Sequence, residues 1–424
     1  MHDFLFNSKD IERSSYIWNM AGSMLLAFQS VIMLMIITRS LGLEAAGVYT
    51  IAYANANLFL TVGKYGMRNF QVSDVKGSYS FGNYFSSRCI TTIIMLLVSL
   101  FYVLLTAQRY GYSKEKCYVI LWMCLFKAVD SMEDVFHALY QKCGRLDVAS
   151  KILTLRMAIT IIFFGFNVVV TKNLLKSLIH STLVTIVLFL FSIFCTYGTF
   201  KIRNLKWDIG TVKKLLFRCF PLFIGGFLSF YIGNAPKYAI DIYLSDEVQA
   251  CYGFIAMPVF VIGLLNGFVF NPILYKISVM WHEQRRKEFI RCILRQCLIL
   301  AMITVSCMGG GYLLGIPVLS ILYHTDLTGY RIELLILLLG GGFLGLSGLL
   351  NTVVTIMRYQ RMVIFIYGVV AIIALFLSKP VVYRYQIFGA SIMYTSLMAM
   401  LCILFVCLIV YGLMKKADEK EEVR

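Results

Sequence analysis

The chain has 424 residues, of which 59 % are hydrophobic and 14 % are charged, and its formal net charge is +17. Soluble proteins carry about a quarter of charged residues, so this composition excludes an ordinary soluble protein and indicates a membrane protein. Apolar runs of about 20 residues, the length that crosses a hydrocarbon core, recur along the whole sequence. The polar first thirteen residues do not resemble a cleavable signal peptide.

These runs predict an all-α membrane protein with about twelve transmembrane helices. No connecting segment between them is long enough for a separate soluble domain. In chain order, the expected spans cover residues 14–38, 47–66, 88–108, 117–140, 151–171, 177–200, 215–243, 250–275, 291–322, 332–357, 362–383 and 387–413.

The positive charge is distributed as a membrane topology requires. Three of the 39 Lys and Arg residues lie inside spans (Lys64, Lys127 and Arg156), and most of the others fall on the side that holds both termini. Because Lys and Arg accumulate on the inner side, we expect both termini to be cytoplasmic. The expected location is the inner (cytoplasmic) membrane of the cell. The remaining basicity attracts anionic membrane lipids. We expect no nucleic-acid partner.

The twelve cysteines are scattered and form no C-x-x-C pair. This spacing is typical of buried structural thiols, so we expect no metal site and no cofactor.

Two turns indicate an internal repeat. LGLEAAGVYTIA (Leu41–Ala52) follows the first span and LSDEVQACYGFIA (Leu244–Ala256) follows the seventh. Their alignment maps the first span onto the seventh, as in transporters built from repeated halves. We expect an N-terminal six-helix bundle (1–200), a cytoplasmic linker (201–214), a C-terminal six-helix bundle (215–413) and a charged cytoplasmic tail (414–424).

The segment FKAVDSMEDVFHALYQ, residues 126–141, places five ionisable groups in the fourth span: Lys127, Asp130, Glu133, Asp134 and His137. At about 100° per residue they share an arc of about 120°. A charge that faces lipid near the bilayer centre costs at least about 2.5 kcal/mol, so this stripe has to face protein or water. Two interpretations stay open. One is a structural network in which Lys127 pairs with Asp130 and the remaining acids pair with Lys64 and Arg156, and the other is a solvated cavity for a charged ligand.

Basic residues of the N-terminal bundle favour an anionic ligand. Arg and Lys in a low-dielectric cavity attract phosphate strongly, and a diphosphate on a lipid carrier would suit them. The acids of the stripe then either tune the bases or bind a coupling ion, H⁺ or Na⁺, and His137 is expected at the polar rim. The cavity candidates are Arg39, Lys64, Arg68, Lys127 and Arg156, together with Lys237 of the seventh span.

The seventh span carries a second charged pair, in NAPKYAID (Asn234–Asp241). Lys237 and Asp241 are four residues apart and can form a salt bridge. Asn234 and Pro236 suggest a broken helix end, where transporters place ligand contacts.

All six prolines lie in the second half. Pro221, Pro236 and Pro258 are hinge candidates, because proline removes a backbone hydrogen bond and bends a helix. Ordinary kinking of membrane helices explains them equally well.

Three segments carry a family resemblance: residues 220–272, TRSLGLEAAGVY (Thr38–Tyr49) and YQIFGASIMY (Tyr385–Tyr394). They resemble the corresponding regions of bacterial polysaccharide flippases of the multidrug/oligosaccharidyl-lipid/polysaccharide exporter (MOP) superfamily. The resemblance implies two six-helix bundles in a V that open alternately to each side. It also implies transfer of an undecaprenyl-diphosphate-linked oligosaccharide to the outer leaflet for surface polysaccharide synthesis, with assembly partners such as a polymerase.

Two alternatives stay open. A cation-coupled multidrug exporter of the same superfamily usually relies on an acidic residue in the first span, and residues 14–38 contain none. A membrane enzyme of polysaccharide assembly, such as a polymerase or an acyltransferase, needs a large outer loop or a characteristic histidine pattern, and neither is present. Because no G-x-x-x-x-G-K-[ST] loop occurs, we expect a transporter and not an ATP-hydrolysing enzyme.

Overall fold

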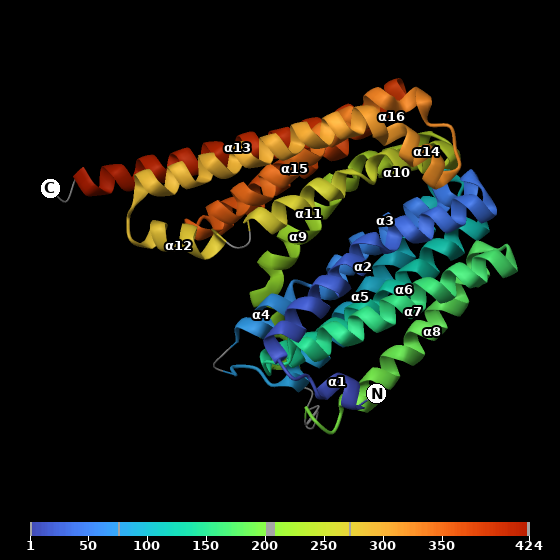
Figure 1. Cartoon of the computed structure of the whole chain (residues 1–424), viewed down its shortest axis with the longest axis horizontal. Helices are drawn as coiled ribbons and strands as arrows, with labels where there is room; N and C mark the ends of the chain where they lie inside the picture. Colours follow the sequence, from blue (N-terminus) through green and yellow to red (C-terminus); the bar gives the residue numbers. More distant parts are fainter. Residues whose placement is uncertain (1, 75–76, 201–207, 271–272, 422–424) are drawn as a thin grey trace. The chain divides into compact units, whose positions relative to one another are not determined.

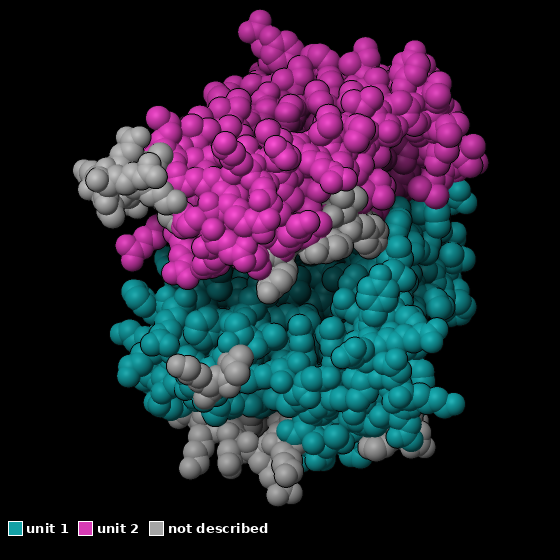
Figure 2. Space-filling model, turned by 60° about the vertical axis from the view of Figure 1, so that its left-hand side comes forward, with its two compact units in different colours: residues 1–227 teal, residues 228–424 magenta. Residues whose placement is uncertain are grey.

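The computed structural model describes residues 2–74, 77–200, 208–270 and 273–421, and every regular element within these ranges is a helix (Figure 1). Contacts divide the chain into two compact units, residues 1–227 and 228–424 (Figure 2). We call them the N-terminal and the C-terminal unit. The predicted all-α architecture is confirmed for the described residues.

The N-terminal unit contains one short helix at the start of the chain, six long helices and one further short helix between the second and third long ones. In chain order they are α1 (His2–Phe6), α2 (Ile11–Leu41), α3 (Leu43–Lys64), α4 (Met67–Ser73), α5 (Phe81–Tyr110), α6 (Lys114–Lys142), α7 (Leu146–Thr171) and α8 (Leu174–Thr196). The first part of α9 (Ile209–Tyr243) also belongs to this unit. Side-chain caps help to set the helix starts: Asp10 accepts a hydrogen bond from Arg13 N at α2, and Ser113 accepts one from Lys116 N at α6.

The C-terminal unit contains the rest of α9 and all later helices. They are α10 (Asp246–Ala256), α11 (Val259–Phe270), α12 (Leu274–His282), α13 (Arg286–Gly310), the π-helical turn η2 (Gly311–Gly315), α14 (Ile316–Tyr323), the 3₁₀ turn η3 (Thr328–Tyr330), α15 (Arg331–Ile356) and α16 (Gln360–Glu421). Pro258 separates α10 from α11. Gln386, with φ 51° and ψ −133°, interrupts α16, so this segment consists of two helices.

Eight helices of the described residues are long and apolar enough to cross a membrane. Helices α3 and α6 are also long enough, because 22 and 29 residues extend for about 33 and 44 Å. Both carry polar residues along one face, which lowers their mean hydropathy. With the two halves of α16 and the broken pair α10–α11, each of the twelve expected spans coincides with a helix or a helix pair.

The predicted linker, 201–214, coincides only in part with described residues. Residues 201–207 lie outside them, and residues 209–214 form the start of α9. Residues 422–424 of the predicted tail also lie outside the described part. The division between the two compact units falls inside α9, after Phe227. The predicted bundle limits stay predictions.

The first half of α9 packs on the N-terminal unit at a backbone break between α3 and α4. Tyr65 and Gly66 both adopt left-handed conformations there, with φ 50° and 63°. The Tyr65 ring stacks on Phe223 of α9, with centroids 4.5 Å apart. A Cβ on Gly66 would lie 2.7 Å from the Cβ of Leu222, so only glycine permits this approach.

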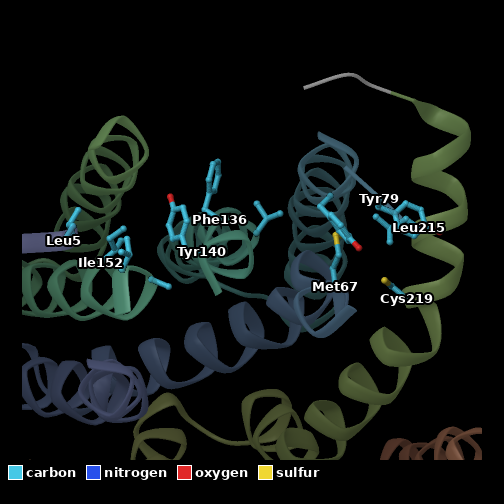
Figure 3. Packing of buried hydrophobic residues seen from close by; sticks show 12 residues of the cluster. Leu5, Met67, Tyr79, Phe136, Tyr140, Ile152, Leu215 and Cys219 are labelled. Atoms are coloured by element: carbon cyan, nitrogen blue, oxygen red, sulfur yellow. The ribbon is translucent and has the colours of Figure 1, made fainter. Parts of the chain in front are cut away.

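A buried hydrophobic cluster ties this part of α9 to α4, α5 and α6 (Figure 3). Leu215 and Cys219 of α9 are fully buried in it, beside Met67 and Tyr79. The same cluster continues through α6 and α7 to Leu5 of α1. The cluster therefore packs the neighbouring helices together beside the charged segment of α6.

Candidate functional site

The charged segment of α6 lies inside the N-terminal unit. Lys127, Asp130, Glu133, Asp134 and His137 are all buried, with Lys127 only 1 % exposed. Helix α6 packs against α3, α5, α7 and α8, which surround this face with protein. The stripe therefore does not face lipid, as the cost of a charge in hydrocarbon requires.

Arg156 of α7 lies at the centre of a buried ion-pair network. Its Nε lies 2.9 Å from both carboxylate oxygens of Glu133, and its Nη2 lies 2.7 Å from Asp130 Oδ1. Asp130 also pairs with Lys127, whose Nζ is 3.0 Å from Oδ2. Lys127 Nζ further donates to Gln29 Oε1 of α2 at 2.9 Å. The network thus joins α2, α6 and α7.

Asp134 forms a second part of the network with two arginines. Arg88 Nη2 of α5 lies 2.8 Å from Asp134 Oδ2, and Arg68 Nη1 of α4 lies 3.4 Å from Oδ1. Arg88 is completely buried and also donates to Gly63 O of α3 at 2.9 Å. Arg68 is 36 % exposed and also donates to Gln141 Oε1 at 3.1 Å.

Sequence reasoning missed Arg88. The expected third span begins at this residue, whereas α5 begins at Phe81 and places Arg88 two turns inside the helix. The serine cap at Ser80, which accepts a hydrogen bond from Asn83 N, was the signal that marks the earlier start.

His137 lies beside the network but forms no hydrogen bond to it through Nε2. Its Nε2 lies 3.8 Å from Glu133 Oε1, which is beyond hydrogen-bond distance, and this nitrogen has no partner among the described residues. The residue is buried and not at a rim, so the expected rim position is wrong.

Lys64 differs from the other cations of the cluster. It is half-buried at the end of α3 and has no hydrogen bond or ion pair among the described residues. It nevertheless lies close enough to act electrostatically on Asp130 and Asp134. With Lys64, the cluster contains five cations and three carboxylates. The excess charge is at Lys64 and at the half-exposed Arg68.

The other predicted residues lie apart from this cluster. Arg39 is exposed in the last turn of α2, and Pro221 lies within the part of α9 that belongs to the N-terminal unit. Lys237 is half-buried in the C-terminal unit and makes no hydrogen bond or ion pair within the described residues, so the salt bridge to the buried Asp241 does not form.

The helix end expected at Asn234–Pro236 is absent. Helix α9 continues through Pro236 to Tyr243, and Asn234 Nδ2 donates to Phe230 O one turn earlier at 3.0 Å. Membrane helices tolerate proline because nearby groups compensate for the lost backbone bond. Pro258 does separate two helices, α10 and α11.

The described residues contain no group of three or more His, Cys, Asp or Glu side chains arranged to hold a metal ion. Paired charges make up most of the cluster, and its two excess cations, Lys64 and Arg68, are both half-buried.

Comparison with solved structures identifies the fold. The lipid II flippase MurJ in an inward closed conformation superposes with a TM-score of 0.72 at 14 % identity, over 93 % of this chain and 89 % of that one. A multidrug resistance MATE family transporter of the MOP superfamily, in an inward-facing conformation, gives 0.66 at 13 % identity, over 96 % and 99 %. A MOP superfamily transporter from Pyrococcus furiosus gives 0.60 at 12 % identity, over 97 % and 96 %.

Comparison with protein-family models and with curated proteins finds no match to the sequence. At such low identity, the structural likeness establishes the fold. The chain is a multi-pass membrane protein with the fold of MOP superfamily transporters.

Proposed function

We propose that the protein is a flippase that moves an undecaprenyl-diphosphate-linked oligosaccharide from the inner to the outer leaflet of the cytoplasmic membrane. The diphosphate would bind at Lys64 and Arg68, at the edge of the charged cluster in the N-terminal unit. The glycan would then enter surface polysaccharide synthesis, where a polymerase is a suitable partner.

The excess of two cations in the cluster carries the proposal. Lys127, Arg88 and Arg156 are matched by Asp130, Glu133 and Asp134. Among the described residues, Lys64 has no hydrogen bond or ion pair, and Arg68 makes a 3.4 Å contact with the shared Asp134 carboxylate and a hydrogen bond to Gln141. A diphosphate esterified at both ends carries about one negative charge per phosphate. Its charge therefore matches the excess, and arginine and lysine are the side chains that bind phosphate most strongly.

The sign of the charge disfavours a cationic drug as the substrate. A drug cation would meet the two excess cations, Lys64 and Arg68, and the three carboxylates of the cluster are already in ion pairs. The fold alone does not separate the two functions, because both a lipid II flippase and MATE transporters share it.

The direction of transport requires a source of free energy, and we assign this to a coupling ion, H⁺ or Na⁺. Both termini are taken to be cytoplasmic because of the Lys and Arg bias of the loops. Collapse of the proton gradient or of the sodium gradient should stop export if that ion is coupled. Export that persists after both are collapsed would contradict this part of the proposal.

The proposed function is tested in a strain that lacks the protein. Its lipids are extracted, and undecaprenyl-diphosphate oligosaccharides are measured before and after a sugar-oxidising reagent is added outside whole cells. We expect the glycolipid to accumulate and to be protected from the reagent, and a plasmid copy of the wild-type gene should reverse both effects. Normal levels of a glycolipid that reacts fully with the reagent would refute the proposal.

A further inference from the structure

Helix α3 carries a line of polar side chains that lies outside the carboxylate pairs of the network. From Tyr49 to Lys64 every α3 residue is buried except four, which are half-buried: Tyr53, Asn57, Thr61 and Lys64. Their spacing of four, four and three residues places them within about 80° on one helical face. We call these four residues the α3 stripe.

Helix α5 of the same unit shows what a lipid-facing line looks like. At the same spacing, Ile93, Leu97, Phe101 and Leu104 are 56–64 % exposed, and all four are apolar. A lipid-facing line has to be apolar, because a polar group in hydrocarbon loses its hydrogen bonds to water. The α3 stripe is polar and half-buried, so it does not have the character of a lipid-facing line.

The α3 stripe keeps unused hydrogen-bonding capacity. Asn57 Nδ2 donates to Tyr53 O at 2.8 Å, and Thr61 Oγ1 donates to Leu58 O at 2.6 Å. Within the described residues, the Asn57 amide oxygen and the Tyr53 hydroxyl have no partner. The stripe thus offers a phenol, an amide oxygen and a hydroxyl oxygen that can still accept.

We propose that Tyr53, Asn57 and Thr61 bind the sugar portion of the transported glycolipid while Lys64 and Arg68 hold its diphosphate. This inference rests on the proposed function. Sugar hydroxyls both donate and accept hydrogen bonds, and these three side chains can do the same. The distance along α3 from Tyr53 to Lys64 is about 16 Å, which leaves room for several sugar rings in a row. The charged end of α3 then sets the position of the first sugar.

The experiment measures the Kd of two probes for the full-length protein in detergent. One probe is undecaprenyl diphosphate, and the other is the glycolipid extracted from the strain that lacks the protein. We expect the wild type to bind the glycolipid about tenfold more tightly than the bare carrier, a gain of about 1.4 kcal/mol that one or two hydrogen bonds can supply. The double substitution Asn57→Leu with Thr61→Val should remove this tenfold gain and leave the carrier Kd unchanged.

Two further variants control for folding. Thr50→Val removes a buried hydroxyl of the same helix, which donates to Ala46 O at 2.8 Å, and should leave both Kd values unchanged. Thr61→Ser keeps the oxygen and should retain the tenfold gain. Lys64→Gln should weaken the binding of both probes.

The inference would be overturned if the double variant still bound the glycolipid about tenfold more tightly than the carrier. Equal weakening of both probes by the double variant would do so as well, because the α3 stripe would then be structural. If the wild type binds the carrier and the glycolipid with the same Kd, the inference that the α3 stripe binds sugar is refuted, whereas the proposed diphosphate binding is not. If neither probe binds, both the proposed function and the proposed sugar binding by the α3 stripe are refuted.

Discussion

Arg156 and Lys64 carry the same formal charge in opposite surroundings. Arg156 is 3 % exposed and contacts two carboxylates, so its charge is neutralised within the N-terminal unit. Lys64 is half-buried and has no ion-pair partner among the described residues. Arg156 is thus held in the network, whereas Lys64 is one of the two cations that we propose bind the ligand. Of the other expected cavity cations, Lys127 is buried in ion pairs like Arg156, and Arg68 is half-exposed with a 3.4 Å contact to Asp134 and a hydrogen bond to Gln141.

Replacing Arg156 with leucine should destabilise the protein strongly. The change leaves Glu133 buried without its ion-pair partner, and such a loss costs about 3–5 kcal/mol. We expect a clear fall in Tm for the purified protein in detergent. The matched control is Arg291→Leu, at an exposed position without a hydrogen bond or ion pair among the described residues, which should leave Tm nearly unchanged. Equal Tm values for Arg156→Leu and wild type would contradict the network.

Replacing Lys64 and Arg68 should affect binding and not stability. Each of Lys64→Gln and Arg68→Gln should raise the Kd for undecaprenyl diphosphate about tenfold, because a charge-assisted hydrogen bond contributes about 1.5–3 kcal/mol. Tm should stay close to the wild-type value. Lys176→Gln, which removes an exposed lysine at the start of α8, is the matched control. Unchanged affinity in both test variants would exclude them from the site.

Helix α15 contains a run of three glycines at which neighbouring helices pack closely. Gly340, Gly341 and Gly342 each face a different neighbour: α16, α11 and α13. A Cβ on Gly342 would lie 2.5 Å from the side chain of Thr304. The run therefore lets three helices approach the central one, as small residues do in membrane bundles.

Gly342→Ala should lower Tm, because a methyl group forced into a filled contact costs about 1–3 kcal/mol. Gly348→Ala on the same helix is the control. Its Cβ would meet nothing within 4 Å, and alanine favours the helix over glycine. The two variants should therefore change Tm in opposite directions, and equal Tm losses would show that the contact at Gly342 does not matter.

The turn between α4 and α5 is held by Asp74. Its carboxylate accepts hydrogen bonds from Ser78 N, Tyr79 N and the Tyr84 hydroxyl, and it lies 3.6 Å from Lys142 Nζ. Desolvation acts to raise the pKa of Asp74, but these contacts together hold it below its ordinary value.

A lowered pKa in the folded state gives stability that is present above the unfolded pKa, about 3.9 for aspartate, and is lost as the pH falls through the folded pKa. Asp74→Asn should therefore lower Tm at pH 7, and the difference from wild type should shrink below about pH 4. A difference that is independent of pH would show that the charge of Asp74 does not stabilise the turn.

For the whole molecule, apolar runs and charge bias were enough to predict an all-α membrane protein. The helical periodicity of residues 126–141 also located the buried stripe, because charge in hydrocarbon is costly enough to leave a clear pattern. Partners were harder to predict. The sequence left Lys127 and Arg156 either in a structural network or at a cavity, since it shows charge but not distance. The distances of 3.0 and 2.7 Å that join them to Asp130 agree with the structural network.

The α3 stripe escaped prediction for a related reason. Its four polar residues lie in a span of mixed character, and their meaning depends on which neighbours of α3 are buried. Which residues of α3 are buried is determined by tertiary packing and cannot be read from the sequence of α3 alone. The same limit applies to Arg88, whose burial depends on an earlier start of α5.

The most direct test of the account is a flipping assay in liposomes that contain the purified protein. The glycolipid extracted from the deletion strain is placed in the membrane, and its sugars are probed with an oxidising reagent from one side over time. The account predicts that wild-type protein makes the protected pool accessible, whereas the double variant Lys64→Gln with Arg68→Gln leaves it protected. Equal flipping by the two proteins, or none by the wild type with a coupling-ion gradient present, would contradict it.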